Sequence, residues 1–212
     1  MIRLIQSKYK AQYSDEVDQM HRLRASVFSG RLGWDVQVVD GWEIDPFDAL
    51  DPLYLVSLDS LGHVRGTLRL LPTTGPNMLR NVFHCLLPDG LVIESPRIWE
   101  SSRFSVDLSL PAERSANRLN RVTGELLAGI VEVGILAGLT HVVSVYDARM
   151  ARVLKQAGCP ADLMGEPRRI GEVMTYAGLF DTDEAMLGRI RAAAGLAGSV
   201  LEPETRELAF AA

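Results

Sequence analysis

The sequence predicts an α/β sandwich, with helices on the faces of a mixed β-sheet. Strand-like and helix-like segments alternate along the 212 residues, in the order strand, helix, long loop, hairpin, strand, helix, strand, helix, strand. A buried strand at 139–146, followed by a helix and a last strand, forms a crossover unit that predicts parallel pairing nearby. The length and the hydrophobic fraction of 47% are typical of one globular domain, which we place over 1–212.

The first helix carries a charge on its apolar side. Residues 2–6 predict a first strand, and residues 14–30 predict a helix that Ser14 or Asp15 caps. Apolar side chains recur along one side of this helix, and Arg24 falls among them. Because a buried arginine needs an acidic partner, the helix predicts an ion pair with another part of the chain.

The remaining elements follow from periodicity and turn residues. The segment 31–52 has no clear period, but Trp34, Trp42 and Phe47 can anchor it, so we expect an ordered loop. Further on we expect a hairpin at 53–72, a short helix or turn at 77–88, strands within 97–107, 139–146 and 167–180, and helices at 115–139, 148–158 and 181–195. The alanine-rich tail from about 196 is expected to be loose.

Composition and charge argue against several classes of protein. A net charge of −5 disfavours a nucleic-acid-binding protein. The sequence contains no run of about 18 uncharged apolar residues, so we expect no membrane span. Residues 1–12 lack the apolar stretch of a signal peptide, which favours the cytoplasm. Cys85 and Cys159 are too few for a cysteine metal site, and the histidines show no ligand spacing, so no metal is expected.

The charges are segregated along the chain. From Leu32 to Val64 there are many acidic residues and no lysine or arginine, whereas arginines gather from Arg97 onward. This segregation favours two ligands of opposite charge, and the alternative is a polar surface divided by chance.

The segment 97–107 combines strand-forming residues with two opposite charges, Glu100 and Arg103. In a regular strand these side chains point to opposite sides, so they meet only across a bulge or a bend. One interpretation is an exposed sheet edge with solvated charges. The other is two buried charges, each with its own partner.

Taken together, these residues resemble a known family. The pattern consists of Arg24 and Phe28, Trp34, Asp45 and Asp48 in "WEIDPFD", Arg69, and Glu100 and Arg103 in "WESSRFSVD". In order and spacing it resembles the acyl-homoserine-lactone synthases, the bacterial autoinducer synthase family, over roughly residues 1–180. The resemblance implies an N-acetyltransferase-like three-layer α/β sandwich with a mixed, mostly antiparallel central sheet.

The resemblance also implies a reaction. Members of the family transfer an acyl group from acyl carrier protein or coenzyme A to the amine of S-adenosylmethionine. The methionyl carboxylate then attacks its own γ-carbon, closes a lactone and expels methylthioadenosine. No cofactor is needed beyond these substrates, and the product is a quorum-sensing signal. The acidic segment suits S-adenosylmethionine, which is net cationic, and the basic residues suit an anionic phosphopantetheine or carrier protein.

Roles follow for the matching residues. We expect Glu100 to remove the amine proton, directly or through water, and to form the catalytic set with Arg103 and Asp45. Substrate contacts are expected from Arg24, Phe28, Trp34, Trp42, Asp48, Arg69, Phe104 and Ser144. An alternative for Arg24 is a buried pair that only ties the helix to the loop.

The sequence also predicts where the two charges of 97–107 point. We expect Arg103 to contact a carboxylate of the 45–48 loop, and Glu100 to face the cleft with Arg24 or Arg69 nearby. The acyl pocket is expected among Trp42, Phe104, the strand 141–146 and the helix after it.

Two basic groups are candidates for docking the acyl donor. They are Arg114, Arg118 and Arg121 on one predicted helix, and Arg149, Arg152 and Lys155 on another. Each group has an ordinary solvated helix face as its alternative. The segment "RVTGEL" at 121–126 matches a coenzyme A turn only in part, so the sequence does not choose between the two donors. It also does not define the acyl chain. Two other functions stay open: an N-acyltransferase that forms no lactone, and a non-enzymatic ligand-binding relative.

Overall fold

The computed structural model describes residues 1–109, 115 and 119–210. Its centre is a sheet with the strand order β1-β4-β5-β6-β7-β10-β8, and β9 pairs with β10. The strands of this sheet are β1 (Ile2–Gln6), β4 (Leu53–Leu58), β5 (Val64–Pro72), β6 (Ile98–Val106), β7 (His141–Asp147), β8 (Asp162–Leu163), β9 (Arg168–Ile170) and β10 (Val173–Asp181). A separate two-stranded ribbon consists of β2 (Val38–Val39) and β3 (Trp42–Glu43).

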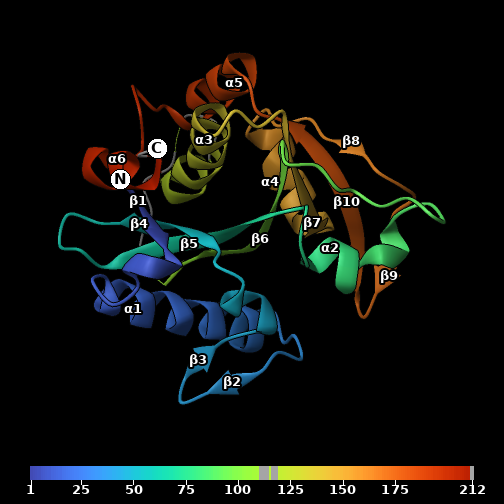
Figure 1. The fold of residues 1–212 in the computed structure, drawn as a ribbon, viewed down its shortest axis with the longest axis horizontal. Coiled ribbons are helices and arrows are strands. Elements are labelled where there is room, and N and C mark those ends of the chain that lie inside the picture. Colours follow the sequence, from blue (N-terminus) through green and yellow to red (C-terminus); the bar gives the residue numbers. More distant parts are fainter. Residues whose placement is uncertain (110–114, 116–118, 211–212) are drawn as a thin grey trace.

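Helices cover both faces of the sheet (Figure 1). They are α1 (Ser14–Ala25), which continues as a π-helical turn over Ser26–Arg31, α2 (Met78–Asn81), α3 (Arg121–Leu136), α4 (Ala148–Gln156), α5 (Glu184–Ala194) and α6 (Pro203–Phe210). In Figure 1, α1 and α2 lie on one side of the sheet, and α3, α4 and α5 lie on the other. The predicted α/β sandwich with a mixed, mostly antiparallel sheet is confirmed.

The sheet contains one parallel pairing, between β6 and β7, where Ile98 pairs with His141 and Ser101 with Ser144. The other pairings in this sheet are antiparallel. Parallel pairing was expected near the last crossover. The parallel strands are β6 and β7, which α3 connects. The strands β7 and β10, between which α4 lies in the chain, are antiparallel, so the parallel pairing precedes the predicted crossover unit.

The two faces of the sheet bury different side chains. Toward α3, α4 and α5, the inward side chains form one large apolar cluster, which includes Leu55, Leu68 and Val142 from the strands. Toward α1, a smaller cluster with Met20 and Tyr54 at its centre is flanked by charged residues. Near α2, a third apolar cluster includes Leu79, Val143 and Ala177. One face of the sheet is therefore apolar, and the other, which we call the polar face, combines smaller apolar clusters with buried charges.

The long segment 31–52 is ordered, as predicted. It contains the β2–β3 ribbon and a 3₁₀ turn at Pro46–Ala49, and Asp45 caps this turn by accepting a hydrogen bond from the Phe47 amide at 2.9 Å. The aspartate before Pro46 thus starts the turn with a capping box, in which the Asp48 side chain accepts the Asp45 amide.

The C-terminal half differs from the predictions in three details. The helix expected at 115–139 begins at Arg121, because Asn120 has an extended backbone and caps the helix through its side chain. The strand expected within 167–180 is the β9–β10 hairpin, which turns at Gly171 with a φ of +56°. The tail expected to be loose packs against the fold in its described part, where Val200 and Leu201 are buried and α6 follows them.

Within the described residues, no helix combines the length and the apolar character that crossing a membrane requires.

Candidate active site

Three arginines from three different elements converge on the acidic loop. Arg24 comes from α1, and its guanidinium contacts both oxygens of Asp48 at 2.8 Å and Glu43 Oε2 at 2.5 Å. The Arg24 side chain is 1% exposed. The prediction that Arg24 is buried and paired with an acidic residue is therefore confirmed. This pair ties α1 to the loop that follows it.

Arg69 comes from β5 and lies beside Arg24. Its Nη1 donates to Asp45 Oδ1 at 2.6 Å and to Asp48 Oδ1 at 2.9 Å, and its Nη2 donates to Asp45 Oδ2 at 3.0 Å. Asp48 Oδ1 also accepts the Tyr54 hydroxyl at 2.8 Å. Asp48 is therefore shared by two guanidiniums and a phenol, which fixes its position.

Arg103 comes from β6, at a break in the strand. Its φ is +56°, and the register with β5 shifts between Thr67 and Arg69, so β6 contains a bulge here. The guanidinium contacts Glu43 Oε1 at 3.0 Å and Asp45 Oδ2 at 2.7 Å. The predicted contact between Arg103 and the 45–48 loop is confirmed, and no direct Glu100–Arg103 pair is seen among the described contacts.

The bulge corrects another expectation about Arg103. A regular strand would point Arg103 and Glu100 to opposite faces of the sheet. Instead both contact Met78: Arg103 Nη1 lies 3.2 Å from the Met78 sulfur, and the Met78 amide donates to Glu100 Oε2 at 2.9 Å. Both side chains thus lie on the polar face, because the left-handed residue turns the strand by one position.

We call these six residues the charged network: Arg24, Arg69 and Arg103 with Glu43, Asp45 and Asp48. Burial alone would raise the pKa of the Asp48 carboxyl, but the hydrogen bonds and charge of Arg24, with the charge of Arg69, hold that pKa well below its usual range. The network contains three cations and three anions, so it is neutral as a unit. The acidic segment holds no lysine or arginine of its own, and the cations that compensate Glu43, Asp45 and Asp48 come from other elements.

Glu100 is placed differently from the expectation that it faces a cleft. The residue is 1% exposed. Its two carboxylate oxygens accept the Met78 amide and the Leu79 amide, the latter at 2.6 Å, so it holds the first turn of α2. Burial raises the pKa of the Glu100 carboxyl, against the opposing effect of these two amides. Arg69 and Arg103 are near enough to affect that pKa, whereas Arg24 pairs elsewhere.

The aromatic residues divide into two groups. Phe28 stacks on Trp34 with ring centroids 5.2 Å apart, and the Arg103 guanidinium lies 5.3 Å from the Phe28 ring centroid. Trp42 instead stacks on His21 at 5.2 Å and donates its indole N–H to Asp18 at 2.8 Å. Phe28 and Trp34 therefore border the charged network, and Trp42 anchors the β2–β3 ribbon to α1.

The expected acyl pocket is corrected by this arrangement. Phe104 packs against the apolar cluster on the α3 side of the sheet, whereas Trp42 lies against α1 on the opposite side. The two residues are not brought together. Ser144 pairs with Ser101 of β6, and its hydroxyl donates to the Ser101 carbonyl at 2.8 Å.

The strands β6 and β7 stop pairing beside this site. Their ladder ends at Ser101 and Ser144, although β6 continues to Val106 and β7 to Asp147. The facing edges of 102–106 and 145–147, which we call the unpaired edges, therefore have backbone groups that no ladder between these strands uses. They begin next to the Arg103 bulge.

The predicted docking residues are described in part. Arg149, Arg152 and Lys155 are exposed on α4, the helix that follows β7. Arg121 is exposed and contacts Glu125 at 3.2 Å, while Arg114 and Arg118 lie outside the described residues. The α4 group thus forms a basic helix face near the end of an unpaired edge.

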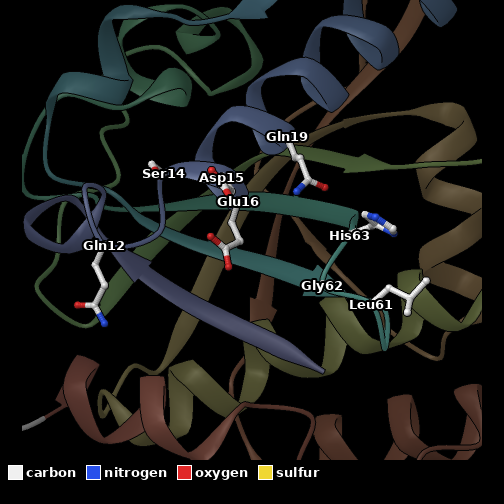
Figure 2. Close-up of a pocket in the computed structure, with 8 residues that line it drawn as sticks. All are labelled: Gln12, Ser14, Asp15, Glu16, Gln19, Leu61, Gly62 and His63. Atoms are coloured by element: carbon white, nitrogen blue, oxygen red, sulfur yellow. The ribbon is translucent and has the colours of Figure 1, made fainter.

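A hollow of about 390 Å³ lies elsewhere, between the start of α1 and the hairpin that joins β4 to β5 (Figure 2). Its walls are Gln12, Ser14, Asp15, Glu16, Gln19, Leu61, Gly62 and His63. No member of the charged network lines it, so it does not mark the candidate active site. In the part of the chain that is described, no group of three or more His, Cys, Asp or Glu side chains is arranged to hold a metal ion.

Sequence reasoning missed Glu43 and the α2 turn. Glu43 is 1% exposed and bridges Arg24 and Arg103, and its backbone oxygen contacts His21 Nδ1 at 2.9 Å. Its spacing was the signal that could have found it, because Glu43 precedes Asp45 by two residues in "WEIDPFD" and shares a direction with it in extended backbone. Met78 and Leu79 gave no such signal, since they contribute backbone amides.

The chain matches the autoinducer synthase family over residues 8–190. An acyl-homoserine-lactone synthase of Agrobacterium fabrum is 43% identical, with 84% of each chain covered. An acyl-homoserine-lactone synthase of Pseudomonas aeruginosa is 34% identical, with 72% of this chain and 76% of that one covered.

Solved structures agree. BjaI, a coenzyme A-dependent acyl-homoserine lactone synthase solved with S-adenosylmethionine and isopentyl-CoA, has a TM-score of 0.83 at 27% identity, over 95% of this chain and 92% of that one. LasI has a TM-score of 0.77 at 28% identity, over 92% and 93%. Fold and site thus define an acyltransferase with an N-acetyltransferase-like fold. The chain belongs to the autoinducer synthase family, and its activity is acyl-homoserine-lactone synthesis.

Proposed function

We propose that the chain binds S-adenosylmethionine beside the charged network and the acyl donor along the unpaired edges, and that acyl transfer takes place where the two meet, at the β6 bulge. One observation carries this assignment: the bulge places Arg103 in the network at the point where β6 separates from β7. The amine of S-adenosylmethionine and the thioester of the acyl donor would therefore meet beside Arg103.

Acyl transfer and ring closure need only the two substrates. The amine nitrogen attacks the thioester carbonyl, the carbon–sulfur bond breaks, and the thiol departs. In the second step the methionyl carboxylate attacks the γ-carbon and the sulfonium leaves as neutral methylthioadenosine. Neither step changes an oxidation state, so no cofactor is proposed. Both substrates are cytoplasmic metabolites, which supports the cytoplasm as the place of action.

Glu100 is the proposed base of the first step. Its raised pKa makes the carboxylate a stronger base than an exposed glutamate, and the two amides of α2 hold it in a fixed orientation. Because Glu100 is buried and bonded to α2, the proton reaches it through a water molecule or after the α2 turn shifts. Arg103 and Asp45 orient the substrate at the bulge, and Phe28 and Trp34 provide an aromatic wall.

The backbone of the unpaired edges suits the acyl donor. The pantetheine arm of coenzyme A and of acyl carrier protein contains amides, which can pair with a strand edge. Arg149, Arg152 and Lys155 on α4 are placed to attract the anionic part of either donor. The similar protein BjaI was solved with an acyl-CoA, which makes an acyl-CoA the first candidate donor and acyl carrier protein the second.

The test is an assay of the purified chain with S-adenosylmethionine and a panel of acyl-CoA and acyl-carrier-protein donors. We expect one methylthioadenosine per acyl-homoserine lactone, measured by mass spectrometry. An acylated S-adenosylmethionine without methylthioadenosine would identify an N-acyltransferase that forms no lactone. Binding without turnover for every donor would favour a ligand-binding relative and would contradict the proposal.

A further inference from the structure

The sheet ends at β1, and the outer edge of β1 is covered by residues 199–207, which we call the strap. The Ile2 amide donates to the Val200 carbonyl at 2.8 Å, and the Glu202 amide donates to the Ile2 carbonyl at 2.8 Å. The Leu4 amide donates to the Thr205 hydroxyl at 3.1 Å. The outward backbone groups of an edge strand are thus used within the same chain.

Side chains fasten the strap at two points. Arg3 on β1 forms a bidentate pair with Glu202, at 2.8 and 2.7 Å, and also contacts Glu16 on α1. On α3, the buried Glu132 accepts the Ser199 hydroxyl at 2.5 Å and the Val200 amide at 3.1 Å. The strap is therefore connected to the sheet and to both helical layers.

The strap is also part of the core. Val200 and Leu201 are 7% and 2% exposed and belong to the apolar cluster under α3 and α5, and Thr205 is 2% exposed.

The two ends of the sheet differ in their need for such a cover. At one end, β8 is only two residues long, Asp162–Leu163, and a short edge strand is a poor template for pairing. At the other end, β1 has five residues with the sequence IRLIQ, and Arg3 is the one charge on it. Without the strap, β1 would present a longer, mostly apolar edge with unpaired amides.

We propose that the strap keeps β1 from pairing with β1 of a second copy of this chain. Two identical edge strands can pair antiparallel about a two-fold axis, so each copy offers the other a complete partner. The strap holds the same backbone groups that this pairing needs, and strap closure and dimer formation therefore exclude each other. The inference is independent of the acyl-transfer site, because no member of the charged network takes part.

Glu202→Lys in the full chain tests the proposal, because it replaces an attraction to Arg3 with a repulsion. Glu204→Lys is the matched control, since Glu204 lies two residues further along the strap, is exposed and undergoes the same change of charge. We measure hydrogen exchange at the Ile2 and Leu4 amides, and molecular mass by sedimentation over a range of micromolar concentrations. In Glu202→Lys we expect exchange at least about tenfold faster, because a charge-assisted bond is lost, and a dimer that grows with concentration. In Glu204→Lys we expect neither.

Two outcomes would overturn the proposal. Faster exchange with a mass that stays monomeric would show that an open edge does not self-associate. Unchanged exchange at both amides would show that Glu202 does not hold the strap. If Glu202→Lys fails to fold, Thr205→Val removes the acceptor of the Leu4 amide at nearly constant volume, and the same two measurements then decide.

Discussion

The two faces of the sheet are held together by different interactions, apolar packing on one face and buried ion pairs on the other. The face under α3, α4 and α5 is filled by aliphatic side chains, whose burial is favourable in many alternative arrangements. The face under α1 holds three guanidiniums and three carboxylates that are buried or largely buried, where every charge has to be matched by a partner in the right place. The apolar face therefore stabilises the fold, and the polar face fixes the geometry of the site.

Desolvation explains why such a network signals function. Replacing a buried ion pair with apolar residues of similar volume is often neutral or stabilising, so a fold does not need one for stability. The network in this chain connects α1, β5, the β6 bulge and the 43–48 segment. It orders four elements around the bulge, which a set of aliphatic contacts would do with less directional precision.

The largest expected effect is on the polar face. Asp48→Asn leaves Arg24 and Arg69 without the carboxylate that they share. We expect a loss of about 3–5 kcal/mol in unfolding free energy in urea, because an unmatched charge stays buried. Asp51→Asn is the control: Asp51 is exposed, and its φ of +53° is one that asparagine accepts. Equal stability of the two variants would contradict the shared role of Asp48.

The pH dependence of this contribution has a defined sign. The pKa of Asp48 is lower in the folded chain than in the unfolded chain, so its stabilising effect is present above the unfolded value of about 3.9 and is lost as pH falls toward the folded value. The difference in stability between the wild type and Asp48→Asn should therefore shrink in acid.

The second effect is on turnover. Glu100→Gln keeps the shape of the side chain, and we expect turnover at least about tenfold lower if Glu100 is the base. The acidic limb of the pH profile should also disappear. If Glu100 only holds α2, turnover falls but the limb stays. Glu94→Gln, at an exposed residue that contacts Arg80, is the control and should retain activity.

Glu100 and Asp48 affect stability in opposite directions as pH rises. The pKa of Glu100 is raised in the folded chain, so the folded state holds its proton longer, and stability falls as pH rises through the interval between the two values. The stability of the wild type relative to Glu100→Gln should therefore be higher in acid than at neutral pH. Urea unfolding at several pH values measures this trend, and the opposite trend would contradict the raised pKa.

A third prediction concerns the apolar face. A Cβ added at Gly124 on α3 would lie 2.4 Å from the Ala194 Cβ on α5, so Gly124→Ala forces the two helices apart. We expect a loss of about 1–3 kcal/mol in unfolding free energy. The turnover of the folded fraction should not change, because neither Gly124 nor Ala194 belongs to the charged network or to the unpaired edges. Gly188→Ala is the control, since nothing lies within 4 Å of its added Cβ and alanine favours the helix.

Several features of the fold and of the site could be predicted from the sequence. The ion pair of Arg24 could be predicted, because a charge within the apolar stripe of a helix needs a buried partner and the acidic loop offers carboxylates. Gly62 in the hairpin turn and Gly158 after α4 both have positive φ, which agrees with the hairpin predicted at 53–72 and the helix predicted to end at 158. The element order and the family pattern together predicted the sandwich and five of the six residues of the charged network, all except Glu43.

Other features could not be predicted, because no short stretch of the sequence indicates them. The bulge depends on a left-handed arginine, and arginine does not mark that conformation in a sequence. Docking of the strap depends on contacts between residues such as Arg3 and Glu202, which are far apart in the chain. An alanine-rich composition was a poor guide there, because Val200 and Leu201 supply the burial.

The smallest expected effect concerns Trp42 and tests whether this residue belongs to the acyl pocket. Trp42 was predicted to line the acyl pocket, but it stacks on His21 and donates to Asp18 on the outer side of α1. Trp42→Phe keeps an aromatic ring for the stack and removes one hydrogen bond, so we expect a loss of about 0.5–1.5 kcal/mol in unfolding free energy. The ranking of acyl donors by kcat/KM should not change, because the ring contacts His21 and Asp18 of α1 and not the unpaired edges. Phe104→Leu is the comparison, since Phe104 packs beside the unpaired edges and its truncation should change that ranking. A changed donor ranking in Trp42→Phe would place Trp42 in the acyl pocket after all and would show that the β2–β3 ribbon moves when substrate binds.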